Sequence, residues 1–313
     1  MPVMSILCAV DFSDTSALAL TCAREIADHY AQPLAVVTVV DPLLAAAEQV
    51  QAGKDPVALI RQALHDFVSE RIGSGRPQGQ HLHVRIGHTA DEVLQVANEV
   101  HAQLLVVGTQ GSTGIEKLMF GSVAERLLRA ADRPVLVVPP AFADSTRHVM
   151  GSMREVLVPV DFHDHAFDDA RVAVRVAHSS HARVHLVHVL PDDGMGRWTV
   201  LPSLVAPQLL EHLQQARGGR ADTALAALQR LADALDLPTP PTVRVLEGNI
   251  ADTLAAAAAR DTVDLVVMGL RGAPTVDAGR VGSVAYRLLS VSPVPVLALP
   301  AVSRGSHVMG FLG

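Results

Sequence analysis

One glycine pattern occurs twice in this chain, and the duplication constrains the fold more than any other feature. Both copies read Gly-x2-Gly-x9-Gly-Ser, the first from Gly108 to Ser122 and the second from Gly269 to Ser283. Each copy follows a run of small apolar residues and precedes a helical pattern. Glycine lets the backbone approach a phosphate, and the first turn of a helix presents free N–H groups to it. The sequence therefore predicts two anion-binding loops.

The two loops belong to two similar halves of the chain. Asp11 ends the first apolar run of one half, and Asp161 ends that of the other. A period of about 150 residues indicates duplicated domains, because solenoid repeats are several times shorter. We predict a first domain at residues 1–140, a linker at 141–153, a second domain at 154–301 and a C-terminal tail at 302–313, each domain with one anion-binding loop.

Composition narrows the function classes. The net charge is −7, and no basic run or series of stacking aromatics appears, which argues against nucleic acid as a partner. No signal peptide and no apolar stretch long enough to span a bilayer is evident, so we expect a cytoplasmic protein with no membrane span. Cys8 and Cys22 are interpreted as reduced core residues, with a disulfide or a reactive pair as the alternative.

Val/Leu runs alternate with helical patterns in both halves, which is typical of a parallel sheet covered by helices on both faces. We predict an α/β fold of two tandem open five-stranded parallel sheets. The expected strands lie at 4–10, 34–40, 81–86, 103–108, 134–138, 155–160, 184–190, 242–247, 263–269 and 294–299. The expected helices lie at 14–30, 55–72, 90–101, 121–131, 165–179, 203–235, 250–260 and 282–290.

Ligands of open α/β sheets bind at the carboxyl ends of the strands, where the strand order reverses. The two aspartates and the two glycine loops would meet there. Each serine would then hold phosphate, or it would only cap its helix. Each aspartate would accept a hydrogen bond from a ribose hydroxyl or act on a metal-bound triphosphate, or it would only cap the helix that follows. Neither a P-loop nor a dinucleotide fingerprint is present.

The glycine pattern after a Val-Val strand, the Pro-Val strand after it, and the aspartate closing the first strand resemble the universal stress protein family. The resemblance covers nearly the whole chain as two tandem copies. It implies a Rossmann-like sheet of the adenine nucleotide alpha-hydrolase-like type, and ATP (or AMP or ADP) with Mg²⁺ or Mn²⁺ as the cofactor. It also implies pairing of the last strands, 134–138 and 294–299, as a pseudo-dimer within the chain, with a homodimer also possible.

The resemblance implies the following binding residues. Asp11 and Asp161 would sit beside the nucleoside. At the ends of the second strands, the backbones of Val39 and Val40 and of Val189 and Leu190 would face the adenine edge. The phosphate and ribose contacts of the first half would be Gly108, Gly111, Gly121, Ser122 and Val123, and those of the second half would be Gly269, Gly272, Gly282, Ser283 and Val284.

The two loops are not equivalent. The second spacer lacks the Ser-Thr-Gly step of the first and places Asp277 near the expected phosphates, where Arg271 and Arg280 would offset its charge. We therefore expect the first site to bind more strongly, with a purely structural second copy as the alternative. His163 and His165 are interpreted as a solvated helix start, although a metal site with Asp161 or Asp168 is the other interpretation.

Three functions fit these features. The first is a regulatory module that binds adenine nucleotide and signals to an unknown protein partner. The second is a slow ATPase or phosphotransferase, for which Asp11, Glu116 and Asp277 are candidate bases outside any recognisable catalytic constellation. The third is a nucleotide-free scaffold. The intact Gly-Ser steps favour the first, and we assign no catalytic residue.

Overall fold

The structure is a computed structural model. It describes residues 5–46, 55–73, 81–109, 121–144, 153–162, 166–192, 207–235, 237, 239–270 and 282–300.

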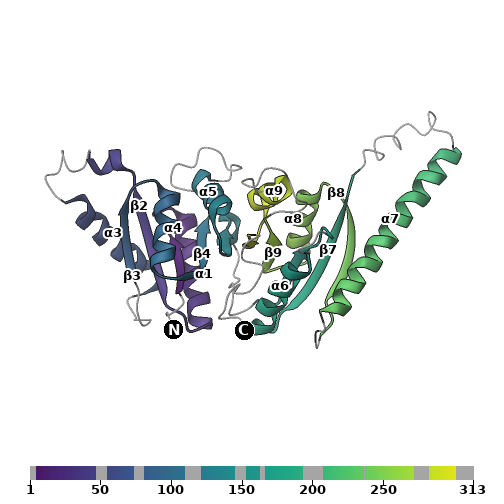
Figure 1. Ribbon diagram of the computed structural model, residues 1–313, viewed down its shortest axis with the longest axis horizontal. Helices are drawn as coiled ribbons and strands as arrows, with labels where there is room; N and C mark the ends of the chain where they lie inside the picture. Colours follow the sequence, from purple (N-terminus) through teal and green to yellow (C-terminus); the bar gives the residue numbers. More distant parts are fainter. Residues whose placement is uncertain are drawn as a thin grey trace.

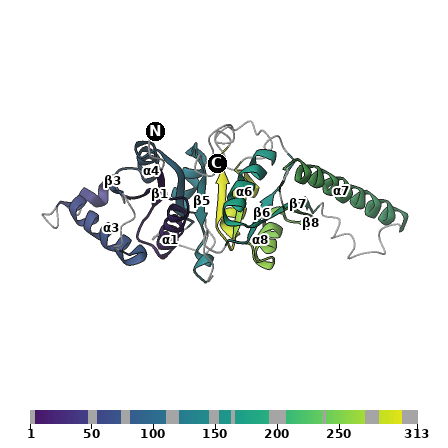
Figure 2. The same ribbon diagram turned by 90° about the horizontal axis from the view of Figure 1, so that it is seen from below.

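A single ten-stranded sheet runs through both halves, in the order β3-β2-β1-β4-β5-β10-β9-β6-β7-β8. Figures 1 and 2 show it with α3 near one end and α7 near the other. The strands of the first half are β1 (Ser5–Ala9), β2 (Leu34–Val40), β3 (His81–Ile86), β4 (Ala102–Gly108) and β5 (Val135–Val138). Those of the second half are β6 (Glu155–Pro159), β7 (Arg183–Pro191), β8 (Thr242–Gly248), β9 (Leu265–Gly269) and β10 (Val296–Leu299).

The halves meet at β5 and β10, which pair antiparallel with Leu297 opposite Leu136. All other neighbouring strands pair in parallel. The α/β class, the parallel sheet within each half and the pairing of the last strands are thus as predicted. The two predicted sheets are joined edge to edge into one. Tyr30 Oη and Ser179 Oγ add a hydrogen bond of 2.6 Å between the halves.

Helices cover both faces of the sheet. One face is covered by α1 (Asp14–His29), α3 (Pro56–Ile72), α6 (Ala166–Ser180) and α7 (Pro207–Ala234), and the other by α4 (Thr89–Glu99), α5 (Ser122–Ala130), α8 (Ile250–Arg260) and α9 (Ser283–Val291). A short 3₁₀ helix, η1 (Pro140–Asp144), follows β5. Strand side chains alternate between the faces, so Ile6 packs in one layer and Leu7 in the other. Both layers continue across the junction between the halves.

Cys8 on β1 and Cys22 on α1 are both buried and both free thiols. Burial raises the pKa of each thiol far above its usual value, because a thiolate is poorly solvated there. The interpretation as reduced core residues holds. Among the helices that the structure describes, none combines the length and apolar character needed to cross a bilayer.

Candidate functional site

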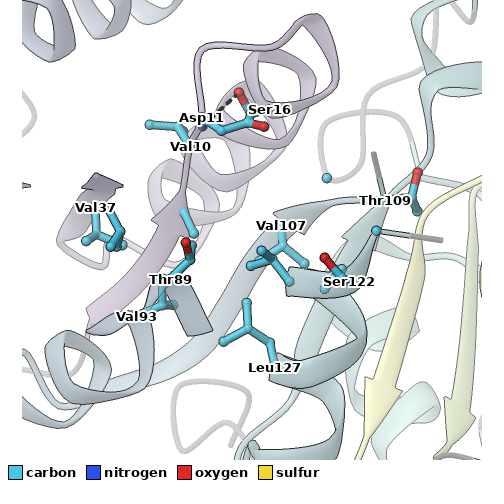
Figure 3. A pocket seen from close by; sticks show the side chains of 16 residues that line it. Val10, Asp11, Ser16, Val37, Thr89, Val93, Val107, Thr109, Ser122 and Leu127 are labelled. Carbon is cyan, nitrogen blue, oxygen red and sulfur yellow. Dashed lines mark hydrogen bonds between the residues drawn. The ribbon is translucent and has the colours of Figure 1, made fainter. Parts of the chain in front are cut away.

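The strand order reverses between β1 and β4, and a cavity of about 300 Å³ opens at their carboxyl ends. We call it the switch-point cavity. Figure 3 shows Val10 and Asp11 on one side of it and Ser122 and Leu127 of α5 on another. Its lining also includes Gly108, Gly121 and Val123, so residues from the aspartate end of β1 and from the glycine pattern come together as predicted from sequence.

The start of α5 opens into this cavity without a side-chain cap. Its N-cap is Gly121, which offers no side-chain acceptor, whereas Ser13, Asp55 and Asn249 cap α1, α3 and α8 with their side chains. The first N–H groups of a helix have no partner within the helix. An uncapped first turn therefore presents its donors, and the positive end of its dipole, to whatever occupies the cavity.

The serines are not the N-caps of their helices, so that alternative is wrong. Ser122 and Ser283 are the first helical residues of α5 and α9, and the N-caps are Gly121 and Gly282. The α9 helix also lacks a side-chain cap. Val123 is exposed and lines the switch-point cavity.

Each glycine loop is closed at its base in the same way. The Gly121 N–H donates to Thr109 O at 2.7 Å, and the Gly282 N–H donates to Leu270 O at 3.1 Å. The Thr109 N–H in turn donates to Val138 O at the end of β5, and the Leu270 N–H donates to Leu299 O at the end of β10. Both distances are 3.0 Å. The central strands therefore fix where both helices begin. Gly111 and Gly272, the second glycines of each pattern, lie outside the described residues, as does Asp277.

Asp11 does not cap α1. Its Oδ1 accepts the Ser13 N–H at 3.1 Å and the Ser13 hydroxyl at 2.6 Å, and Ser13 is itself the N-cap. Phe12, between them, has a φ of 64°, in the left-handed region that is uncommon for non-glycine residues. Phe162, which follows Asp161, has a φ of 59°. The residue after each aspartate thus has the same left-handed backbone in both halves, and both aspartates are exposed.

The two helices beside each loop are joined by equivalent ion pairs. Arg126 of α5 lies 3.1 Å from Asp91 of α4, and Arg287 of α9 lies 2.9 Å from Asp252 of α8. These pairs are exposed and contribute little stability. They show that the frame around the first loop is repeated around the second, where Gly269 ends β9 and Val284 lies in the first turn of α9.

Of the two residues expected from the end of β2, Val39 lines the switch-point cavity. Val40 does not line the switch-point cavity, and its carbonyl accepts the Gly87 N–H at 3.1 Å. Val37 and Val39 line the cavity instead, with Thr89 and Val93 of α4. Period-two alternation along β2 is the sequence signal that could have found Val37, two residues before the expected Val39. Leu190, the counterpart of Val40, lines a different cavity on the other face of the sheet.

His163 and His165, the candidate metal ligands, lie outside the described residues. Among the residues that are described, no group of three or more His, Cys, Asp or Glu side chains is arranged to hold a metal ion.

Gly108 has a structural role beside its place in the cavity. A Cβ there would lie 2.8 Å from Thr15 Cγ2 and 3.2 Å from the Thr15 carbonyl carbon, so β4 and α1 approach too closely for a side chain. A Cβ at Gly282 would make only an ordinary contact of 3.5 Å with Leu270 O.

We therefore expect Gly108→Ala to lower the free energy of unfolding by about 1–3 kcal/mol through overpacking. Gly282→Ala, the matched control, should cost less than about 1 kcal/mol, the scale of a cap substitution. Urea unfolding followed by circular dichroism measures both. Equal losses in the two variants would contradict the packing role of Gly108.

Comparison with known proteins decides the family. The profile of the universal stress protein family matches residues 3–139 and again residues 153–300. The chain belongs to this family. It is similar to the universal stress protein MJ0531 of Methanocaldococcus jannaschii, with 45% identity over 58 residues, which are 18% of this chain and 34% of that one. The first curated relatives are matched over only 21–34% of their own lengths.

Solved structures show the same fold over the whole universal stress protein chain. The protein PA1789 of Pseudomonas aeruginosa PAO1, described as functionally unknown, has a TM-score of 0.63 at 15% identity and covers 98% of this chain and 96% of its own. A universal stress protein in complex with cAMP is 26% identical, with a TM-score of 0.34, over 44% of this chain and 98% of its own.

Proposed function

We propose that this universal stress protein binds ATP, or AMP or ADP, in the switch-point cavity, and that occupancy regulates its conformation or its binding to a protein partner during stress. The observation that carries the proposal is the uncapped start of α5 inside that cavity. The volume of the switch-point cavity, about 300 Å³, lies at the lower end of the range for small-molecule sites.

Each group in the cavity has a role in this proposal. The first-turn N–H groups of α5 and the Ser122 hydroxyl donate to phosphate oxygens. Asp11, oriented by Ser13, accepts from a ribose hydroxyl. The apolar side chains of Val37, Val93 and Leu127 contact the apolar parts of the nucleoside.

The metal in this proposal is Mg²⁺ or Mn²⁺ held by the triphosphate. Asp11 is the acidic side chain in the cavity lining, and a single carboxylate matches how Mg²⁺ is often held, by one or two carboxylates together with substrate phosphates. The ion would neutralise phosphate charge that the helix dipole and the backbone donors leave uncompensated.

We extend the proposal to the second half with lower expected affinity. Its loop closes at Gly282 and Leu270 as the first does, and α9 likewise lacks a side-chain cap. The acidic Asp277 in its spacer opposes phosphate binding by charge repulsion.

Calorimetric titration of ATP with Mg²⁺ into nucleotide-stripped protein tests the function. We expect one strong site per chain, assigned to the first half, and a second, weaker one. Mass spectrometry of the purified protein before stripping is expected to show bound adenine nucleotide. Absence of heat, of co-purified nucleotide and of retained radiolabelled ATP after gel filtration would refute nucleotide binding and favour the scaffold function.

A further inference from the structure

We propose a second ligand site in this protein, for a small uncharged aromatic compound that carries an N–H or O–H donor, such as an indole or a phenol. The site is a cavity of about 390 Å³ between β7 and α7, lined by Phe162, His188, Leu190, Gly219, Ala224 and Ala227, with Arg220 and Thr223. We call it the α7 pocket. It is independent of the proposed nucleotide function.

The α7 pocket lies on the opposite face of the sheet from the nucleotide-type crevice. Val187 and Val189 of β7 pack in the layer of α8 and α9, so His188 and Leu190 point to the layer of α6 and α7. In the first half, the switch-point cavity is lined by Val37 and Val39, on the α4 and α5 face. The α7 pocket is therefore not the second copy of that cavity.

The first half fills the corresponding space with an aromatic ring. On α3, Leu64 and Val68 are buried, and Phe67 packs edge-to-face against Phe12 with ring centroids 5.4 Å apart. The Phe67 ring therefore stands against Phe12 on the side of α3.

The second half keeps the aromatic wall, and among its described residues the ring beside Phe162 is that of His188 on β7, with no ring on the described part of α7 packed against it. Phe162 repeats the place and the left-handed backbone of Phe12. On α7, Ala227 is half-buried and lines the pocket beside Phe162, between the buried Ala224 and Leu228, as Phe67 lies between the buried Leu64 and Val68 of α3. Ala227 and Phe162 both line the α7 pocket, and Figure 1 shows α7 diverging from β7 and β8 towards its N-terminal end.

His188 supplies a specific polar group. The Val10 N–H donates to Val37 O, and the Val160 N–H donates to Val187 O, so Val37 of β2 corresponds to Val187 of β7. His188 is therefore the counterpart of the buried Thr38 in the first half. The centroid of its ring lies 4.6 Å from the centroid of the Phe162 ring. Nδ1 lies 2.7 Å from Val160 O. A carbonyl only accepts, so Nδ1 carries the proton, and Nε2 of the neutral ring is an acceptor. In the proposed complex, an N–H or O–H group of the ligand donates a hydrogen bond to this Nε2.

Reciprocal variants test the site with indole as the probe, followed by calorimetry and saturation-transfer NMR. We expect one indole to bind the wild type. Ala227→Phe, which restores the ring that Phe67 provides in the first half, should weaken this binding at least about tenfold by occupying the space. Phe67→Ala should open the equivalent space and add a second indole site. The double variant should bind indole in the first half alone.

Two controls sharpen the test. N-methylindole should bind the wild type about tenfold more weakly, because it leaves Nε2 of His188 unpaired. ATP binding should be the same in Ala227→Phe as in the wild type, so this site and the nucleotide site succeed or fail separately. Ala224→Leu, which copies Leu64, replaces Ala227→Phe if that variant does not fold.

The proposal is overturned if the wild type binds no indole, or if Ala227→Phe and Ala224→Leu bind it as the wild type does. It is also overturned if indole does not bind and Ala227→Phe shifts the emission of Trp198, the single tryptophan of the chain, because the protein's own indole ring would then fill the space.

Discussion

Gly121→Val is expected to weaken ATP binding in the first half at least about 100-fold, or about 2.8 kcal/mol, while the fold stays intact. The reason is position. Gly121 is the N-cap of α5 and lines the switch-point cavity, so a branched side chain there covers the first-turn N–H groups that would otherwise meet phosphate. Ser122 would keep its hydroxyl, but the valine side chain would separate that hydroxyl from the phosphate oxygens of ATP.

The backbone explains why the fold should survive. Gly121 has φ −62° and ψ 137°, an extended conformation open to valine as well as glycine. Its N–H bond to Thr109 O does not depend on the side chain. We therefore expect the thermal unfolding curve to stay close to that of the wild type while calorimetry records the loss of affinity.

Gly282→Val is the matched control, because Gly282 has the same role in α9 and a Cβ there meets only Leu270 O at 3.5 Å. It should remove the weaker site and leave the strong one unchanged. Undiminished ATP affinity in Gly121→Val would exclude the start of α5 as the phosphate site.

The strands and helices were largely predictable from sequence because the same order of apolar runs and helical patterns occurs in both halves, so an element expected in one half supports its counterpart in the other. The run at 103–108 was expected as a strand, and the structure has Ala102–Gly108. The helix expected at 203–235 spans Pro207–Ala234. Valine-rich runs buried on both faces leave little ambiguity between strand and helix when helical patterns flank them.

The candidate site was predictable in outline but not in its lining. Glycine spacing indicates where the end of a strand and the start of a helix meet at a cavity, and Gly108, Gly121 and Ser122 do line it. Residues without a motif were not predicted. Thr89 and Val93 reach the cavity only because α4 packs beside α5, which is a tertiary relationship.

Two differences from the expectations have specific physical causes. The end of β2 was expected to contribute Val39 and Val40, but position along a strand does not say which face the cavity lies on, and the strand contributes Val37 and Val39 to the lining. The serines were considered as caps because serine is a favoured N-cap, and the chain places a glycine there instead. A glycine N-cap is the better signal for an open anion site, because it leaves the donors uncovered.

The largest stability effect is expected at the strand pair that joins the halves. Leu297 of β10 is 2% exposed and faces Leu136 of β5, which is also 2% exposed. Leu297→Asp removes about 2–3 kcal/mol of apolar burial and places a carboxylate where no water reaches it. We expect a total loss of at least about 4 kcal/mol in the free energy of unfolding. Leu297→Met, the control, should cost less than about 1.5 kcal/mol.

The same variant tests whether the proposed domains, 1–140 and 154–301, unfold together. Because β5 and β10 are neighbours in one sheet and both core layers cross the junction, damage at Leu297 should also reduce amide hydrogen-exchange protection in β4 and β5. Protection in the first half that stays at the wild-type level, while the second half loses it, would contradict this coupling. The two proposed nucleotide sites, one on either side of the junction, would then be expected to act independently, since no shared element would transmit a change from one to the other.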